Sequence, residues 1–148
     1  GVRIDLIVRG ICTLRPGIAG ISDNITVRSI VGRFLEHHRI FYFRSGGNDK
    51  IFISSADWMP RNLNERVELM IPIEDKRHKA RIKGILDLYL VDTLKAHIMR
   101  ADGSYYKVTD VEGPISAQEE LMEAANTQDS REQMTVIERF KPMFKMKE

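Results

Sequence analysis

A histidine and an arginine stand two residues apart in this chain, just before a segment that is typical of a strand. His37 and Arg39 precede the aromatic and β-branched run 40–43. In an extended segment the side chains of residues i and i+2 point to the same face, so the two can address one ligand together. An imidazole can attack phosphorus or move a proton, and a guanidinium can hold two phosphate oxygens at once. The pair therefore indicates a site that handles phosphoryl groups.

Further polar side chains follow the second arm of the hairpin that the sequence predicts here. The run Ser54–Asp57 ends that arm, and pairing of the two arms brings it close to His37. Arg61, Arg66 and Glu68 come soon after it and add two guanidiniums and a carboxylate. This inventory suits phosphoryl transfer, in which catalysis is mostly positioning and charge neutralisation. A turn capped by serine and aspartate is the alternative for Ser54–Asp57.

Arginine without lysine marks the N-terminal part of the chain. Residues 1–39 contain six arginines and no lysine. Arg9 closes the apolar run 4–8, and α/β sheets commonly bind ligands at the carboxyl ends of their strands. Because guanidiniums bind oxyanions in a bidentate way, we interpret this region as phosphate-binding. Scattered surface charge is the alternative.

The composition is that of one ordinary globular domain. The chain has 148 residues, of which 43% are hydrophobic and 30% charged, and its net charge is +2. So small a net charge gives no sign of a nucleic-acid or membrane partner. The single cysteine, Cys12, excludes an internal disulfide and argues against a cysteine-based zinc site.

The sequence shows no targeting segment. Neither a signal peptide nor an apolar run of about 18 residues is visible, so no transmembrane segment is expected. We therefore expect a cytoplasmic protein, and a peripheral association with the membrane stays open. The chain starts at Gly1 and enters a strand-like run at once, which suggests a piece of a longer protein.

Hydrophobic periodicity predicts both strands and helices. Apolar and β-branched runs predict strands over 3–8, 25–31, 39–43, 50–54, 66–73, 96–100 and 105–108. Apolar residues at helical spacing predict a helix over 75–94, and a capping box at Ser116 predicts a short helix that ends near Asn126. A helical turn over 33–36 and a polar loop over 58–64 complete the prediction.

Two other chemistries are poorly supported by the same residues. No glycine-rich loop of the Gly-x-x-x-x-Gly-Lys type is present, and Gly46 and Gly47 are better explained by the hairpin turn. His37, His38 and Asp57 offer atoms that bind metals, but adjacent histidines in an extended segment point to opposite faces.

Several of these segments together resemble one known family. The motifs, in order, are Ile4–Gly10, Gly20–Ile25, Ser29–Arg39, Ser54–Asn62 and Arg66-x-Glu68. On these motifs the chain, from Gly1 to about Gln128, resembles the C-terminal catalytic domain of bacterial polyphosphate kinase of the long-chain-synthesising type. The resemblance implies an α/β fold of the phospholipase D-like kind, a mixed sheet flanked by helices. It implies one domain over 1–128 and leaves 129–148 as a C-terminal tail, either a docking helix or disordered.

The resemblance also implies an activity. Members of the family transfer the γ-phosphate of ATP to a growing polyphosphate chain, reversibly, through a phosphohistidine in the preceding domain. His37 is then the second active-site histidine, beside the phosphates of the nucleotide. Arg9 contacts those phosphates and Arg66 lines the same pocket, while Arg39 and Arg61 are further predicted phosphate-binding residues. The fragment alone, without the nucleophile, is expected to be inactive.

Substrates, cofactors and partners follow from the same resemblance. ATP or ADP and inorganic polyphosphate are the expected substrates, and the Mg²⁺ ligands are expected outside this chain. The upstream domains of the same polypeptide and a second copy in a homo-oligomer are expected partners, whereas nucleic acid is not. Two alternatives stay open: a phosphodiesterase of the phospholipase D type and a non-catalytic module that binds polyanions. The first requires His-x-Lys where this chain has His37-x-Arg39.

Overall fold

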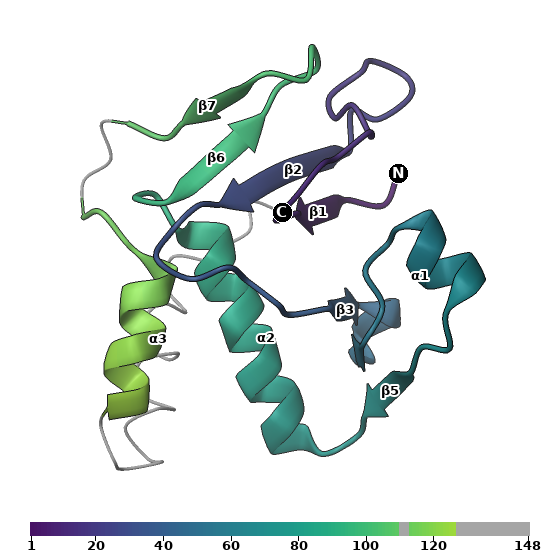
Figure 1. The fold of residues 1–148 in the computed structure, drawn as a ribbon. Coiled ribbons are helices and arrows are strands. Elements are labelled where there is room, and N and C mark those ends of the chain that lie inside the picture. Colours follow the sequence, from purple (N-terminus) through teal and green to yellow (C-terminus); the bar gives the residue numbers. More distant parts are fainter. Residues whose placement is uncertain (110–112, 127–148) are drawn as a thin grey trace. The chain divides into compact units, whose positions relative to one another are not determined.

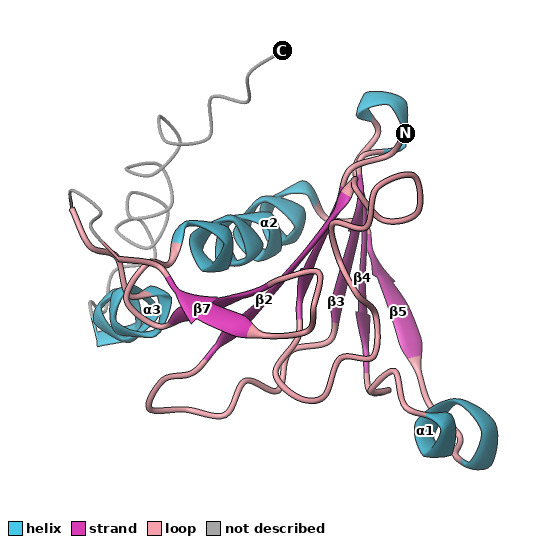
Figure 2. Ribbon diagram, turned by 90° about the horizontal axis from the view of Figure 1, so that it is seen from above, coloured by secondary structure: helices cyan, strands magenta, loops and turns pink. Residues whose placement is uncertain are grey.

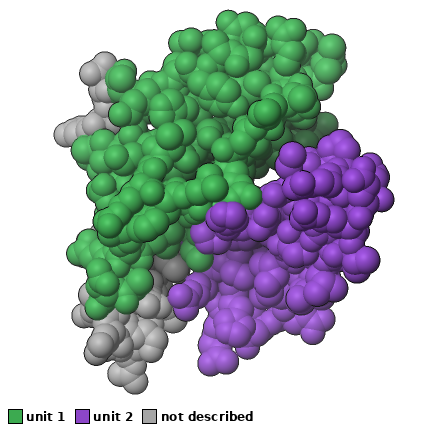
Figure 3. Space-filling view, viewed as in Figure 1, with its two compact units in different colours: residues 1–36, 85–148 green, residues 37–84 purple. Residues whose placement is uncertain are grey.

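The computed structural model describes residues 1–109 and 113–126 of the chain. The chain forms two compact units, coloured green and purple in Figure 3. Unit 1 is Gly1–Glu36 with Ile85–Glu148, and unit 2 is His37–Gly84. The boundary between the units follows Glu36, so His37 is the first residue of unit 2.

Unit 1 is built on a four-stranded sheet in which β1, β2, β6 and β7 lie in that order (Figure 1). The strands are β1 (Ile4–Ile7), β2 (Ile25–Ile30), β6 (Ala96–Met99) and β7 (Tyr105–Lys107). β1 and β2 run parallel, with Ile4 opposite Ile25, and the other neighbours are antiparallel. The sheet is therefore mixed, as predicted. The connection over 8–24 is long because no tight hairpin can join parallel strands.

Two helices bury apolar side chains in unit 1. They are the second half of α2 (Lys76–Val91) and the start of α3 (Ala117–Asn126). Full burial of one large aliphatic side chain stabilises the fold by roughly 1.5–3 kcal/mol. The cluster therefore holds the helices to the sheet. Its buried members are Ile30, Leu88, Tyr89, Ala96, Ile115 and Ala117.

A buried carboxylate connects the end of α2 to the elements that follow it. Asp92 is only 1% exposed. Its Oδ1 accepts hydrogen bonds from the backbone N–H groups of Lys95 at 2.6 Å and Ala96 at 2.9 Å. Its Oδ2 accepts one from the N–H of Ala117 at 2.7 Å. Such bonds replace the water that a buried charge loses, so Asp92 fixes both the start of β6 and the first turn of α3.

Unit 2 contains a three-stranded antiparallel sheet, whose strands lie side by side in Figure 2. Its elements are β3 (Ile40–Phe43), the 3₁₀ turn η1 (Ser45–Gly47), β4 (Lys50–Ser54) and β5 (Met70–Ile73), in the sheet order β3-β4-β5. The predicted hairpin is confirmed. Gly46 and Gly47 make its turn with φ of 60° and 89°, a left-handed region that favours glycine. Ile51 in β4 is only 2% exposed.

One prediction for unit 2 is wrong, and one strand is confirmed with shorter bounds. The predicted loop over 58–64 contains a helix, α1 (Pro60–Glu65). Pro60 occupies its first turn, where the missing N–H has no helical partner to lose. The strand predicted over 66–73 is shorter, because the ladder with β4 begins only at Met70.

The long helix and the remaining strands lie where the sequence predicts them, with shorter ends. α2 covers most of the predicted range 75–94. Asp75 precedes it and caps its start, because Oδ1 accepts the N–H groups of Arg77 at 2.8 Å and His78 at 3.2 Å. The short helix predicted after Ser116 is α3.

The helical turn predicted over 33–36 is wrong, and the predicted tail over 129–148 lies outside the described residues. Phe34 has a partner for each of its backbone groups in the side chain of Gln118. Its N–H donates to Oε1 at 3.1 Å, and its carbonyl accepts from Nε2 at 2.8 Å. A side chain of α3 thus replaces the local hydrogen bonds that a helical turn would have formed.

We expect Asp92→Ala to lower the free energy of unfolding by about 2–4 kcal/mol, because buried N–H groups lose their acceptor. Chemical denaturation followed by circular dichroism measures this loss. Glu119→Ala removes an exposed carboxylate from α3 and serves as the control, with an expected change below about 0.5 kcal/mol. Equal losses in the two variants would contradict the anchoring role of Asp92.

Candidate functional site

Arg39 holds both the backbone of His37 and the side chain of Asp57. Its Nε and Nη2 donate to the two carboxylate oxygens of Asp57 at 3.0 and 2.9 Å. Its Nη1 donates to the carbonyl of His37 at 3.1 Å. The hydrogen bond with Asp57 is the main reason why the pKa of the Arg39 guanidinium is raised. Because a bidentate pair has a fixed geometry, Arg39 holds together the end of the hairpin that lies away from its turn, next to His37.

The carboxylate of Glu68 accepts hydrogen bonds from two side chains of unit 2. Its Oε1 accepts a hydrogen bond from Nδ2 of Asn62 at 2.8 Å, and its Oε2 accepts one from the hydroxyl of Ser55. The Ser55 hydroxyl also accepts the N–H of Leu69 at 3.0 Å. These bonds favour the ionised carboxylate, so the pKa of Glu68 is lowered, first by Ser55 and next by Asn62. The network connects α1 to the residue after β4 and to the segment just before β5.

In unit 1, Arg9 contacts the residue that precedes His37. Its Nη1 donates to the backbone carbonyl of Glu36 at 2.7 Å. The carboxylate of Glu36 accepts hydrogen bonds from Nε2 of Gln118 at 2.6 Å and from the hydroxyl of Tyr89 at 2.7 Å. Burial raises the pKa of the Tyr89 hydroxyl, and its bond to Glu36 raises it further. Tyr89 is therefore a hydrogen-bond donor at neutral pH.

Sequence reasoning included Glu36 only as part of a motif and missed the contacts of Gln118 and Tyr89. In the sequence, Tyr89 belongs to the helical spacing within 75–94, and Gln118 lies inside the capping box that starts at Ser116. Their partner Glu36 lies 53 and 82 residues away along the chain. Separations of that size leave no periodic pattern, so no signal in this sequence points to these contacts.

The predicted phosphate-binding residues divide between the two units. Arg9 lies in unit 1, whereas His37, Arg39, Arg61 and Arg66 lie in unit 2. His37, Arg61 and Arg66 are exposed, and Arg9 and Arg39 are half-buried. Within unit 2 the structure joins His37 and Arg39 directly. Arg61 lies in α1 and Arg66 follows that helix. Their roles in phosphate binding stay predictions.

Neither a metal site nor a membrane span is found in the part of the chain that the structure describes. Over 1–109 and 113–126, no three His, Cys, Asp or Glu side chains are grouped so that they could hold a metal ion. These residues do not fit a Mg²⁺ site, and the position of the Mg²⁺ ligands stays a prediction. No helix among the same residues is long and apolar enough to cross a membrane.

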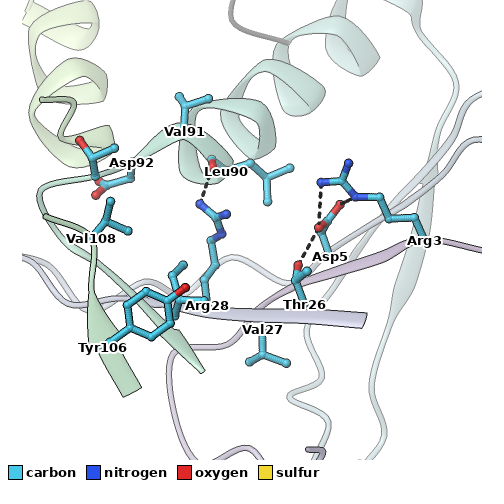
Figure 4. A pocket seen from close by; sticks show the side chains of 12 residues that line it. Arg3, Asp5, Thr26, Val27, Arg28, Leu90, Val91, Asp92, Tyr106 and Val108 are labelled. Carbon is cyan, nitrogen blue, oxygen red and sulfur yellow. Dashed lines mark hydrogen bonds and ion pairs between the residues drawn. The ribbon is translucent and has the colours of Figure 1, made fainter. Parts of the chain in front are cut away.

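Unit 1 has a cavity of about 410 Å³ beside the C-terminal end of α2 (Figure 4). Arg28 reaches from β2 to that helix end, where Nη1 donates to the carbonyls of Tyr89, at 3.3 Å, and Leu90. Burial lowers the pKa of this guanidinium. Arg28 therefore caps helix carbonyls that lack partners within the helix. None of the predicted phosphate-binding residues lines this cavity.

Comparison with known proteins gives a consistent result. Residues 1–118 match the family model described as polyphosphate kinase C-terminal domain 2. A polyphosphate kinase of Pseudomonas aeruginosa is 54% identical over 125 residues, which are 83% of this chain and 18% of that protein. One of Bacillus anthracis is 56% identical over 108 residues, which are 73% of this chain and 15% of that protein.

A solved structure agrees with these relatives. The crystal structure of polyphosphate kinase from Porphyromonas gingivalis matches with a TM-score of 0.80 and 40% identity, over 84% of this chain and 19% of that chain. The match confirms the predicted fold class, α/β with a mixed sheet flanked by helices, as that of the polyphosphate kinase C-terminal domain. The chain spans less than a fifth of the length of each of these relatives.

Ser55→Ala is expected to raise the pKa of Glu68 towards its usual range, because the carboxylate loses its strongest hydrogen bond. Since the folded-state pKa lies below the unfolded one, these bonds stabilise unit 2 fully above the unfolded pKa. The stabilisation is lost as the pH falls through the folded pKa, so the variant loses less stability in acid. An NMR titration of the Glu68 carboxyl carbon measures the shift, with Ser45→Ala as the control. An unchanged pKa in Ser55→Ala would show that the hydroxyl does not hold the charge.

Proposed function

The chain belongs to the polyphosphate kinase family, and from this membership we propose that it is part of an ATP:polyphosphate phosphotransferase. The proposal is carried by the match of residues 1–118 to the family's C-terminal domain 2. The fold match at a TM-score of 0.80 supports it. ATP or ADP and inorganic polyphosphate are the proposed substrates.

The proposed reaction consists of two phosphoryl transfers. First, an imidazole nitrogen of a histidine in an upstream domain attacks the γ-phosphorus of ATP. The N–P bond forms while the bond from the γ-phosphorus to the β,γ-bridging oxygen breaks, and ADP leaves with that electron pair. Then a terminal oxygen of polyphosphate attacks the phosphohistidine, the N–P bond breaks, and the chain grows by one phosphate. Each step also runs backwards.

His37 and Arg9 serve the phosphates of the nucleotide in this scheme. The imidazole of His37 is exposed to solvent and donates a hydrogen bond or a proton to the oxygen on which charge develops as ADP leaves. Arg9 supplies a guanidinium that is charged at any physiological pH. Its bond to the Glu36 carbonyl, at 2.7 Å, fixes where that charge lies within unit 1.

The other arginines contribute positive charge around the polyphosphate. Arg61 and Arg66 are exposed and attract a polyanion electrostatically. Arg66 is the stronger candidate for direct contact, because the resemblance to the family implies an arginine of the phosphate pocket at this position. Arg39 acts at longer range, because Asp57 takes two of its donors.

The proposal extends to a longer polypeptide. Since the chain covers only 18% of the Pseudomonas relative, we assign the phosphohistidine and the Mg²⁺ ligands to upstream domains. Unit 2 exposes apolar side chains on and before β5, with Leu69 at 65%, Met70 at 52% and Ile71 at 49%. Such a surface favours contact with another domain or a second copy. The whole protein is then a cytoplasmic homo-oligomer, with peripheral membrane association open, and this chain alone is inactive.

His37→Ala in the full-length enzyme is expected to lower the kcat of polyphosphate synthesis by about 10²–10⁴-fold, the usual effect of losing an acid–base group. The melting temperature should barely change, because the side chain is exposed. Polyphosphate formed from ATP measures the first quantity and thermal unfolding the second. His38→Ala, which removes the adjacent exposed imidazole, is the matched control. Normal synthesis by His37→Ala would refute the assignment. If the unmodified full-length protein bound polyphosphate but formed none from ATP, the non-catalytic polyanion-binding module would be favoured.

Arg9→Ala is expected to lower kcat/KM for ATP by about 10- to 100-fold, because a charge-assisted hydrogen bond to phosphate is lost. Steady-state kinetics of the full-length enzyme measure the change. Arg15→Ala is the matched control, since Arg15 is an exposed arginine of the same unit whose Nε donates to the Ala101 carbonyl. Unchanged KM and kcat in Arg9→Ala would count against its contact with the nucleotide.

A further inference from the structure

Gln118 connects the first turn of α3 to the segment that leads to His37. Its side-chain amide pairs with both backbone groups of Phe34, at 3.1 Å to the N–H and 2.8 Å to the carbonyl. A residue in a neighbouring strand would pair with Phe34 in the same way. Gln118 is only 5% exposed, so water competes little for these bonds.

The amide of Gln118 lies close to a glycine, Gly32. A Cβ at position 32 would lie 2.3 Å from Oε1 and 2.7 Å from Cδ of Gln118. Real Cβ atoms do not approach so closely, so a larger residue at position 32 makes the end of the Gln118 side chain shift.

The same amide also holds the residue immediately before His37. Nε2 of Gln118 donates to Oε1 of Glu36 at 2.6 Å, while the hydroxyl of Tyr89 donates to Oε2 at 2.7 Å. Tyr89 is 4% exposed and belongs to the buried cluster of unit 1. Two donors from two helices thus hold both oxygens of one carboxylate, and bonds to a charged acceptor are stronger than neutral ones.

The peptide bond between Glu36 and His37 connects the held Glu36 to the backbone of His37. That bond is planar, and its carbonyl oxygen accepts the 2.7 Å hydrogen bond from Arg9. The peptide plane that contains the nitrogen and Cα of His37 is therefore held by the Glu36 side chain and by its own carbonyl. Beyond it, only rotations within His37 remain to be restrained.

We propose that Gln118 and Tyr89 are positioning residues for phosphoryl transfer, which act through Glu36 on the peptide that leads into His37. The inference rests on the proposed function, because it gives them no contact with ATP or polyphosphate. Positioning of reacting groups accounts for much of the catalysis of phosphoryl transfer, and a small displacement of such a group is costly. Loss of either side chain therefore slows the chemical step more than it weakens nucleotide binding.

The first test compares Gln118→Ala and Tyr89→Phe with the wild-type full-length enzyme. Each variant is expected to lower kcat roughly 10- to 100-fold, with a smaller change in KM for ATP. Tyr89→Phe removes a single hydroxyl, so its melting temperature should stay within about 4 °C of the wild type. Tyr105→Phe alters an exposed tyrosine of β7 and is the matched control, with wild-type kcat expected. Wild-type kcat in both Gln118→Ala and Tyr89→Phe would overturn the inference.

A double-mutant cycle separates positioning from a general structural effect. If Gln118 acts through His37, adding Gln118→Ala to His37→Ala lowers kcat by no more than about 3-fold further. Losses that multiply in the double variant would overturn the inference and leave the proposed function intact. Undiminished synthesis by His37→Ala alone would instead overturn the proposed function. The two failures are therefore distinguishable in one set of assays.

Discussion

The backbone on both sides of His37 is held by guanidinium groups. Arg39 donates to the carbonyl of His37, and Asp57 holds its fork in place. Arg9 donates to the preceding carbonyl, that of Glu36. Because peptide bonds are planar, these two anchors restrict the histidine without touching its imidazole. The side chain of His37 thus stays exposed while the backbone on both sides of it is restrained.

The interior of unit 1 makes the polar contacts around Glu36 possible. Gln118 can reach Glu36 only if the first turn of α3 is fixed, and the buried Asp92 fixes it at Ala117. Tyr89 contributes its ring to the apolar cluster and its hydroxyl to Glu36. In such a partly water-free setting hydrogen bonds are stronger and missing partners are more costly. In a chain of the polyphosphate kinase family, ordinary core packing thus holds the polar contacts of Glu36, the residue that precedes His37.

Most of the fold could be predicted from local pattern. The hairpin followed from apolar arms around Gly46 and Gly47, and the structure shows the positive φ angles that these glycines permit. The errors came where local preference competes with a tertiary partner or where an element is very short. The helix that starts at Pro60 has six residues, too few for a periodic signal. The segment 33–36 has helical composition, but Gln118 takes its hydrogen bonds.

The sequence by itself determined the order of the strands and of the helices α2 and α3, and the motifs around His37 that mark the family, whose resemblance implied the mixed α/β class. Spacing and residue type carry this information because neighbours in the chain set the periodicity of each element. Only the tertiary structure decided what Arg39 and Glu36 do. In the folded chain Arg39 pairs with Asp57, 18 residues away, and Glu36 pairs with Gln118, 82 residues away. Such contacts depend on how separate elements pack, and a single sequence records no rule for which donor meets which acceptor.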